Sequence, residues 1–151
     1  MADKPVVDRG AYAWFRAVTT RWMDNDVYGH VNNAHYYSYF DTAINAFLIA
    51  RGGLDIRGGG AVGYVVSSAC SYHEPVAYPD ELEVGLRVDR IGNSSVHYGL
   101  ALFRVGDVRA RASGTMVHVF VDPASSRPVR IPDPVRAALE AIAPGDRGRE
   151  R

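Results

Sequence analysis

Residues 21–40, RWMDNDVYGHVNNAHYYSYF, place a cluster of polar side chains directly before an apolar pattern with helical spacing. Two carboxylates, Asp24 and Asp26, lead through Tyr28-Gly29-His30 to Asn32-Asn33. Ionisable groups at the start of a buried helix indicate a functional site, because a helix N-terminus offers free N–H groups and the positive end of a dipole. The remainder of the chain is expected to form the framework around this loop.

A long helix is predicted after the loop. From Ala34 onward, apolar side chains recur at intervals that place them on one helix face. They are Tyr36, Tyr37, Phe40, Ile44, Phe47 and Leu48. Gly52-Gly53 supplies the C-terminal stop after Arg51. Asn32 or Asn33 is the expected N-cap, because either side chain can accept a hydrogen bond from an N–H of the first turn.

Strand and turn signals dominate the rest of the chain. Strands are predicted over residues 13–20, 62–73, 81–91, 96–104 and 108–121. A short helix is predicted over 135–143, with Asp133 as its N-cap and Pro134 in its first turn. The strand at 81–91 alternates apolar and polar residues, so one face of the sheet is expected to be buried. Short turns between the last four strands imply an antiparallel meander covered by the one long helix.

Length and composition indicate one globular domain. The chain has 151 residues, of which 47% are hydrophobic and 23% charged, and flexible tails are expected at 1–10 and 144–151. Lys+Arg and Asp+Glu number 17 each, so no net positive charge recruits nucleic acid or an anionic membrane. No signal-peptide pattern is present, and no apolar run approaches the roughly 20 residues of a membrane span. A cytoplasmic location is therefore predicted.

The cysteine, histidine and glycine residues argue against a disulfide, a metal site and a phosphate-binding loop. The single cysteine, Cys70, excludes an internal disulfide and is expected to pack in the core, because no Cys–His pairing is evident. The histidines outside the loop lack metal-ligand spacing, so no metal site is predicted. They are His35, His73, His97 and His118. The glycine-rich segment 51–61 lacks the Gly-Lys-Ser/Thr ending of a P-loop and is interpreted as a flexible connector.

The chain resembles acyl-CoA thioesterases of the 4-hydroxybenzoyl-CoA thioesterase type between about Trp14 and Leu139. The matching residues are the run Asp24-Asn25-Asp26-Val27-Tyr28-Gly29-His30-Val31-Asn32-Asn33 with Tyr36 and Phe40 behind it, Tyr72-His73-Glu74-Pro75-Val76 with Asp80, the turn Gly92-Asn93-Ser94-Ser95, and Val121-Asp122-Pro123 before Pro128. The resemblance implies an α+β hotdog fold, in which a five-stranded antiparallel sheet wraps around one long central helix, here followed by a short C-terminal helix.

The resemblance also implies catalytic roles. Asp26 would be the nucleophile or general base, and a backbone N–H near Asn33 would polarise the thioester carbonyl. Both roles fit the chemistry, because negative charge develops on the carbonyl oxygen and an N–H at a helix start is a fixed donor for it. From local sequence alone, turn and capping roles remain the alternatives for both residues. Asp24 could be the acid instead, but a structural or electrostatic role is preferred for it.

An acyl-CoA is the implied substrate, hydrolysed to a free carboxylic acid and coenzyme A without a separate cofactor. The predicted acyl-side contacts are Tyr28, Gly29, His30 and Tyr36. Packing would also explain the two tyrosines, and contact with the loop backbone would explain the histidine. Phosphates of coenzyme A prefer arginine and hydroxyl or N–H donors. The predicted contacts are Arg90, Ser94 and Ser95, with Arg87, Arg109 and Arg111 as alternatives.

The predicted sheet also bears on assembly, since long sheet edges must be protected. Hotdog proteins pair sheets edge to edge, so the resemblance implies a homodimer or homotetramer with the site at the subunit boundary. Two other functions stay open. One is a hotdog hydratase or dehydratase using a carboxylate–histidine pair, for which Asp26 and His30 have the spacing, although the continuation Asn32-Asn33 favours a thioesterase. The other is a non-catalytic protein that binds acyl thioesters.

Overall fold

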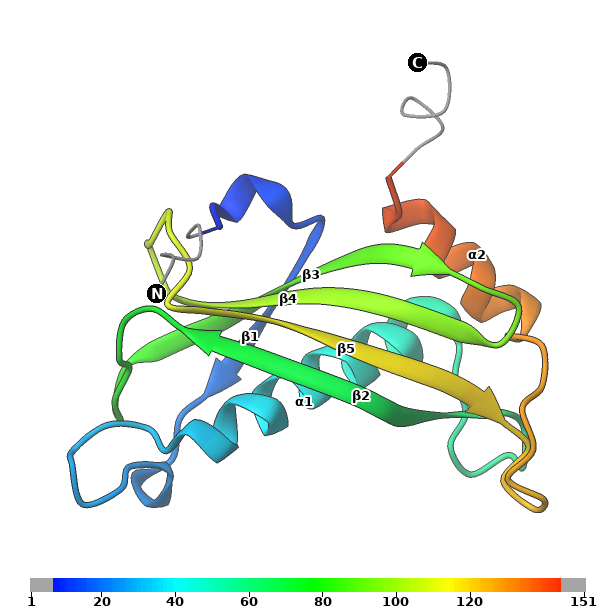
Figure 1. Ribbon diagram of the computed structural model, residues 1–151, viewed down its shortest axis with the longest axis horizontal. Coiled ribbons are helices and arrows are strands. Elements are labelled where there is room, and N and C mark those ends of the chain that lie inside the picture. The colour runs from blue at the N-terminus through cyan, green and yellow to red at the C-terminus, as the bar shows by residue number, and fades with distance from the viewer. Residues whose placement is uncertain (1–6, 145–151) are drawn as a thin grey trace.

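The computed structural model describes residues 7–144, which form an antiparallel sheet curved around one long helix (Figure 1). The strands are β1 (Trp14–Thr19), β2 (Val62–Tyr72), β3 (Glu81–Ile91), β4 (Ser95–Arg104) and β5 (Ala112–Val121). The helices are α1 (Asn33–Gly52) and α2 (Asp133–Ile142), with 3-10 turns η1 (Arg9–Ala11) and η2 (Trp22–Asp24). This arrangement confirms the predicted hotdog fold, with five strands, a long central helix and a short C-terminal helix.

The central helix α1 has the predicted bounds because its caps and its apolar face agree. Asn32 is the N-cap, and Gly53 closes the helix in the left-handed region at φ 65°. The buried face consists of Tyr36, Tyr39, Phe40, Ala43, Ile44, Phe47 and Leu48. It packs on the apolar side of β3, where Leu82, Val84, Leu86 and Val88 are all buried as the alternation predicts.

The predicted meander of the last four strands is wrong at β2. The strand order is β1-β3-β4-β5-β2, so only β3, β4 and β5 form a meander. β2 pairs with β5 instead, from Val62 opposite Val121 to Tyr72 opposite Ala112. The prolines between β2 and β3 mark a reversal of the chain, but local turn chemistry does not specify which strand the chain then pairs with. β2 consequently forms one edge of the sheet.

Two predicted boundaries are also wrong. β5 begins at Ala112 rather than Val108, because the chain before it turns away to pair with the N-terminal segment: Arg9 N donates to the Val108 carbonyl (2.8 Å) and Ala110 N to the Val7 carbonyl (3.0 Å). The cap of α2 is Pro132 rather than Asp133, which lies inside the first turn and makes no capping hydrogen bond.

The tails predicted at 1–10 and 144–151 lie outside the described residues except for 7–10 and 144, so their flexibility stays a prediction. Residues 9–11 form η1, which lies against the connection between β4 and β5 (Figure 1). Neither helix described between residues 7 and 144 is both long and apolar enough to cross a membrane.

Contact between α1 and the sheet depends on Gly114 in β5. A Cβ added there would overlap the Ala69 carbonyl oxygen of the paired strand and stand 3.1 Å from a ring carbon of Phe40. Gly114→Ala is therefore expected to lower the free energy of unfolding by about 1–3 kcal/mol in urea titrations. Gly99→Ala is the matched control, since the three atoms nearest to its added Cβ all belong to the side chain of Arg87 and not to the backbone of a paired strand. Equal losses in the two variants would contradict this account.

Candidate active site

The loop between β1 and α1 is held from within by Asp24, whose side chain is fully buried. Its carboxylate accepts hydrogen bonds from the Tyr39 hydroxyl (2.6 Å), the Arg21 backbone N–H (3.0 Å) and Arg21 Nε (2.9 Å). Burial by itself raises the pKa of Asp24, but the bonds from Tyr39 and Arg21 outweigh it and hold that pKa below its ordinary value. Asp24 is thus an ionised anchor with its acceptors occupied.

Asp26 lies in a different environment, half-buried in a turn that closes at Gly29. Gly29 N donates to the Asp26 carbonyl (3.0 Å) at φ 84°, a conformation that favours glycine. The Asp26 carboxylate accepts from Tyr28 N through Oδ1 (2.9 Å) and from Asn32 Nδ2 through Oδ2 (3.2 Å). No arginine or lysine of the described chain neutralises this carboxylate. Of the two acids, Asp26 is the one that is partly exposed and not ion-paired within the described chain.

The start of α1 provides a hydrogen-bond donor beside that carboxylate. Asn32 accepts from Ala34 N through its side chain (3.0 Å) and from His35 N through its carbonyl (3.0 Å). The Asn33 N–H takes part in none of the hydrogen bonds found among residues 7–144. An N–H in this position, at the positive end of the helix dipole, suits a developing oxyanion.

Tyr28 and His30 lie on the surface of the loop. The Tyr28 side chain is 84% exposed, and the neighbouring apolar side chains Trp22, Met23 and Val27 are also exposed. His30 is exposed too, and only its carbonyl contacts Asp26, accepting from the Asp26 N–H at 2.9 Å. Four exposed apolar side chains within seven residues are typical of a segment that contacts a ligand or another protein.

Tyr36 is buried in the first turn of α1 and packs against the aromatic ring of Tyr72. Its ring meets the Tyr72 ring edge-on at 4.9 Å, and the Tyr72 hydroxyl donates to the Asn33 carbonyl (3.2 Å). Cys70 is half-buried next to these rings, and burial raises the pKa of its thiol, which disfavours a nucleophilic role. Tyr72 was missed as a site residue from sequence, since only its position at a strand end next to turn residues could have signalled it.

The residues predicted to contact coenzyme A are not brought to this loop. Arg90, Ser94 and Ser95 lie at the connection between β3 and β4, which Figure 1 shows at the opposite end of the sheet from the start of α1. Arg136 of α2 holds that connection by donating to the carbonyls of Gly92 (2.7 Å) and Asn93 (3.1 Å).

The alternative candidates Arg109 and Arg111 belong to the connection between β4 and β5, which Figure 1 shows at the same end of the sheet as the start of α1. They line a hollow of about 470 Å³ together with His73, Glu74, Asp107, Val108 and Ala110. Arg111 is ion-paired with Asp107 at 2.7 Å and donates to the Pro75 carbonyl at 3.2 Å. The charges of this hollow are therefore partly compensated within the chain.

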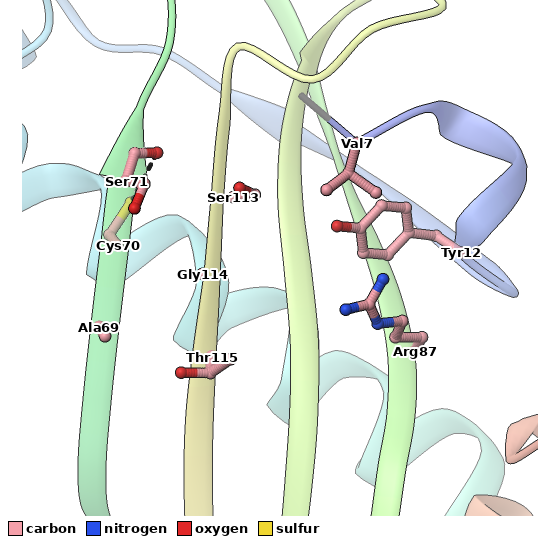
Figure 2. Close-up of a pocket in the computed structure, with 9 residues that line it drawn as sticks. All are labelled: Val7, Tyr12, Ala69, Cys70, Ser71, Arg87, Ser113, Gly114 and Thr115. Carbon is pink, nitrogen blue, oxygen red and sulfur yellow. Dashed lines mark hydrogen bonds between the residues drawn. The ribbon is translucent and has the colours of Figure 1, made fainter. Parts of the chain in front are cut away.

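A second hollow, of about 290 Å³, opens on the face of the sheet turned away from α1 (Figure 2). Figure 2 shows Tyr12 and Arg87 on one side of it and Ser113 and Thr115 on the other. None of the predicted catalytic residues lines it. Among residues 7–144 there is also no group of three or more His, Cys, Asp or Glu side chains suited to a metal ion.

Comparisons with known proteins agree with this architecture. A model of the thioesterase-like superfamily matches residues 18–139. The solved structure of the PA5185 protein from Pseudomonas aeruginosa is 57% identical, with 93% of this chain and 99% of that chain covered and a TM-score of 0.91. The PA2801 protein of the same species, a proposed thioesterase, is 30% identical, with 89% of this chain and 99% of that chain covered and a TM-score of 0.77.

More distant structures share the fold. Slr0204 from Synechocystis, a 1,4-dihydroxy-2-naphthoyl-CoA thioesterase, is 16% identical, with 83% of this chain and 93% of that chain covered and a TM-score of 0.74. At this identity the likeness shows the fold alone. The family match, which spans most of the described residues, confirms the resemblance carried by residues 24–33. The chain belongs to the thioesterase-like superfamily.

Proposed function

We propose that the protein hydrolyses acyl-CoA thioesters to a free carboxylic acid and coenzyme A at the loop that precedes α1. Asp26 acts as nucleophile or general base, and the Asn33 N–H polarises the thioester carbonyl. The observation that supports this is the bond from Asn32 Nδ2 to Asp26 Oδ2 (3.2 Å), which ties the carboxylate to the residue directly before Asn33. A base and an oxyanion donor are thereby held in one rigid segment.

Two routes fit this arrangement. In the first, an Asp26 oxygen attacks the carbonyl carbon, the C–S bond breaks, coenzyme A leaves as the thiolate, and water hydrolyses the resulting anhydride. In the second, Asp26 takes a proton from a water molecule whose oxygen attacks the same carbon, the C–S bond breaks, and coenzyme A leaves as the thiolate, which takes up the proton. In both routes the carbonyl oxygen becomes negatively charged in the transition state and accepts a hydrogen bond from the Asn33 N–H. Water and the thioester are the only reactants, so no cofactor is required.

The substrate contacts form part of the same proposal. Gly29 and His30 border the approach to Asp26, while Tyr28 and Tyr36 contribute aromatic surface for the acyl group. Arg90, Ser94 and Ser95 would contact coenzyme A only from a neighbouring subunit, given their distance along the sheet from the loop. The cytoplasmic location read from the sequence stays a prediction.

The test is release of free thiol from a panel of acetyl-, octanoyl-, palmitoyl- and benzoyl-CoA. Turnover of any of them, lost in Asp26→Asn, supports the proposal. Hydration of an enoyl-CoA without thiol release would favour the hydratase alternative, which needs a carboxylate–histidine pair. Within the described chain the Asp26 carboxylate accepts from Tyr28 N and Asn32 Nδ2 and forms no hydrogen bond with the His30 side chain, which favours the thioesterase. Binding of coenzyme A derivatives without any turnover would indicate a non-catalytic protein.

We also propose that two copies pair through the β2 edge of the sheet into a homodimer, the unit from which a homotetramer would be built. Within the described residues β2 (Val62–Tyr72) pairs with β5 on one side and forms the edge of the sheet on the other, and an edge strand can add a strand from another chain. Its side chains Tyr64, Val65 and Val66 are exposed as well. Because Tyr72 reaches the start of α1, such pairing would put the catalytic loop at the subunit boundary.

Light scattering checks this assembly against the monomer mass of 16.5 kDa. A dimer or tetramer is expected for the wild type, and Val66→Lys on β2 is expected to shift it toward monomer, because a lysine on an edge strand opposes pairing. Val108→Lys is the control, since Val108 is similarly exposed (66% against 60%) but lies on the connection between β4 and β5. A monomeric wild type would contradict the proposal.

A further inference from the structure

The Asn32 side chain makes two hydrogen bonds, one as an acceptor and one as a donor. Its Oδ1 accepts from Ala34 N (3.0 Å), and its Nδ2 donates to Asp26 Oδ2 (3.2 Å). The amide can adopt only this orientation, because a backbone N–H requires an acceptor and an ionised carboxylate requires a donor. Each carboxamide end is therefore matched to one partner.

The backbone of Asn32 is fixed as firmly as its side chain. Its N–H donates to the Asp24 carbonyl (2.9 Å) and its carbonyl accepts from His35 N (3.0 Å). The residue before it, Val31, is 4% exposed and donates its N–H to the Val76 carbonyl (2.8 Å). Asn32 can hold another side chain in place because its own position is set on both sides.

We infer that Asn32 is a positioning residue, whose amide sets the orientation of the Asp26 carboxylate relative to the first N–H of α1. The inference rests on the proposed thioesterase function. Tyr28 N holds Oδ1 of Asp26 from within the turn (2.9 Å), so the bond from Asn32 is the one that ties the other oxygen to the helix. Reaction geometry is sensitive to small misplacements, which makes such a support consequential for rate.

Asn32 has two roles, as the cap of α1 and as the donor to Asp26, and substitutions at this position can separate them. Asp and Ser cap helices about as well as Asn, because capping needs only an oxygen acceptor. Among these, only asparagine combines that acceptor with an amide donor on the same planar group. A substitution that preserves the cap therefore removes the positioning bond, and serine does so without adding a charge.

Asn32→Asp is the decisive variant, with Asn32→Ser beside it to separate loss of the donor from gain of a charge. Asn32→Ser is expected to keep the thermal midpoint within about 3 °C of wild type, because it retains a cap and adds no charge. Asn32→Asp also retains the cap, but it adds a carboxylate beside Asp26, so its thermal midpoint is compared at low pH as well as at pH 7. In both variants, kcat on benzoyl- or octanoyl-CoA is expected to fall by about 10–100-fold with little change in KM. In Asn32→Asp alone, the acid limb of the pH–rate profile is expected to move to higher pH, since two adjacent carboxylates resist joint ionisation.

Comparison with Asp26→Asn separates failure of this inference from failure of the proposed function. If Asn32→Asp retains wild-type kcat and pH profile while Asp26→Asn is inactive, Asn32 does not position Asp26, and the thioesterase proposal stands. If Asp26→Asn also keeps full turnover, the proposed catalytic role of Asp26 is wrong. If both Asn32 variants lose thermal stability and activity in proportion and the pH profile is unmoved, Asn32 acts only as a cap, which overturns the inference.

Discussion

Asp26→Asn is expected to lower kcat/KM for the acyl-CoA substrate by about 10²–10⁴-fold while leaving the fold intact. An amide of nearly the same shape can still accept from Tyr28 N, so the turn around Gly29 is preserved. It is neither a nucleophile for a thioester nor a base for water, so both proposed routes lose their reactive group. Release of free thiol under saturating and subsaturating substrate measures the loss, and circular dichroism checks the fold.

Asp55→Asn is the matched control for this variant. Asp55 is exposed and accepts from the N–H of Arg57, two residues ahead, at 3.0 Å, as Asp26 accepts from Tyr28. It follows the C-terminal end of α1, whereas Asp26 lies in the loop before its N-terminal end. Its substitution is expected to leave turnover unchanged. Activity retained in Asp26→Asn and lost in Asp24→Asn at equal foldedness would mean that the acid was assigned to the wrong carboxylate.

Local signals in the sequence were sufficient for most of the fold. The helix at Asn33–Gly52 was predictable because its cap, its apolar face and its terminal glycines act within a few residues of one another. The alternation of apolar and polar residues in Glu81–Ile91 likewise predicts which face of the strand is buried. The position of β2 was not predictable in this way. Its partner β5 is distant in the sequence, and strand pairing of this kind is decided by the packing of the whole sheet.

The candidate site shows the same division between local and distant information. Residues 24–33 identify the loop, but sequence spacing alone leaves Asp24 and Asp26 nearly equivalent. They are distinguished by Tyr39, which is 15 residues from Asp24 and reaches it from the second turn of α1. Tyr72 reaches the helix start from 39 residues away. No short motif contains such partners, and they become visible only when the chain is folded.

Asp24→Asn is expected to lower the free energy of unfolding at pH 7 by about 3 kcal/mol. The carboxylate is wholly buried and accepts from both Tyr39 and Arg21, so its neutral replacement weakens charge-assisted bonds and leaves a polar mismatch inside the loop. This value is at the low end of the range of about 3–5 kcal/mol for breaking a buried ion pair. The low end applies because the Arg21 side chain is 57% exposed and can be solvated when its partner is lost. Urea titration of both proteins measures it.

The pH dependence of that loss identifies the carboxylate as its source. The pKa of Asp24 is lower in the folded state than its ordinary value of 3.8, so the folded protein binds fewer protons there than the unfolded chain does. The stabilisation is therefore complete above the ordinary pKa and disappears as pH falls through the folded one. The stability gap between wild type and Asp24→Asn is expected to be constant from about pH 8 to pH 5 and to shrink below about pH 4.

Asp89→Asn supplies the comparison, because Asp89 pairs with Arg87 at 2.9 Å but is 39% exposed, where ion pairs contribute about 0–1 kcal/mol. Its substitution is expected to change stability little at any pH. A gap for Asp24→Asn that persists unchanged at pH 3 would show that the ionised form of Asp24 is not what stabilises the loop. A gap that closes would assign to the ionised Asp24 carboxylate the task of holding the shape of the loop, whereas the role of Asp26 is decided by the activity of Asp26→Asn.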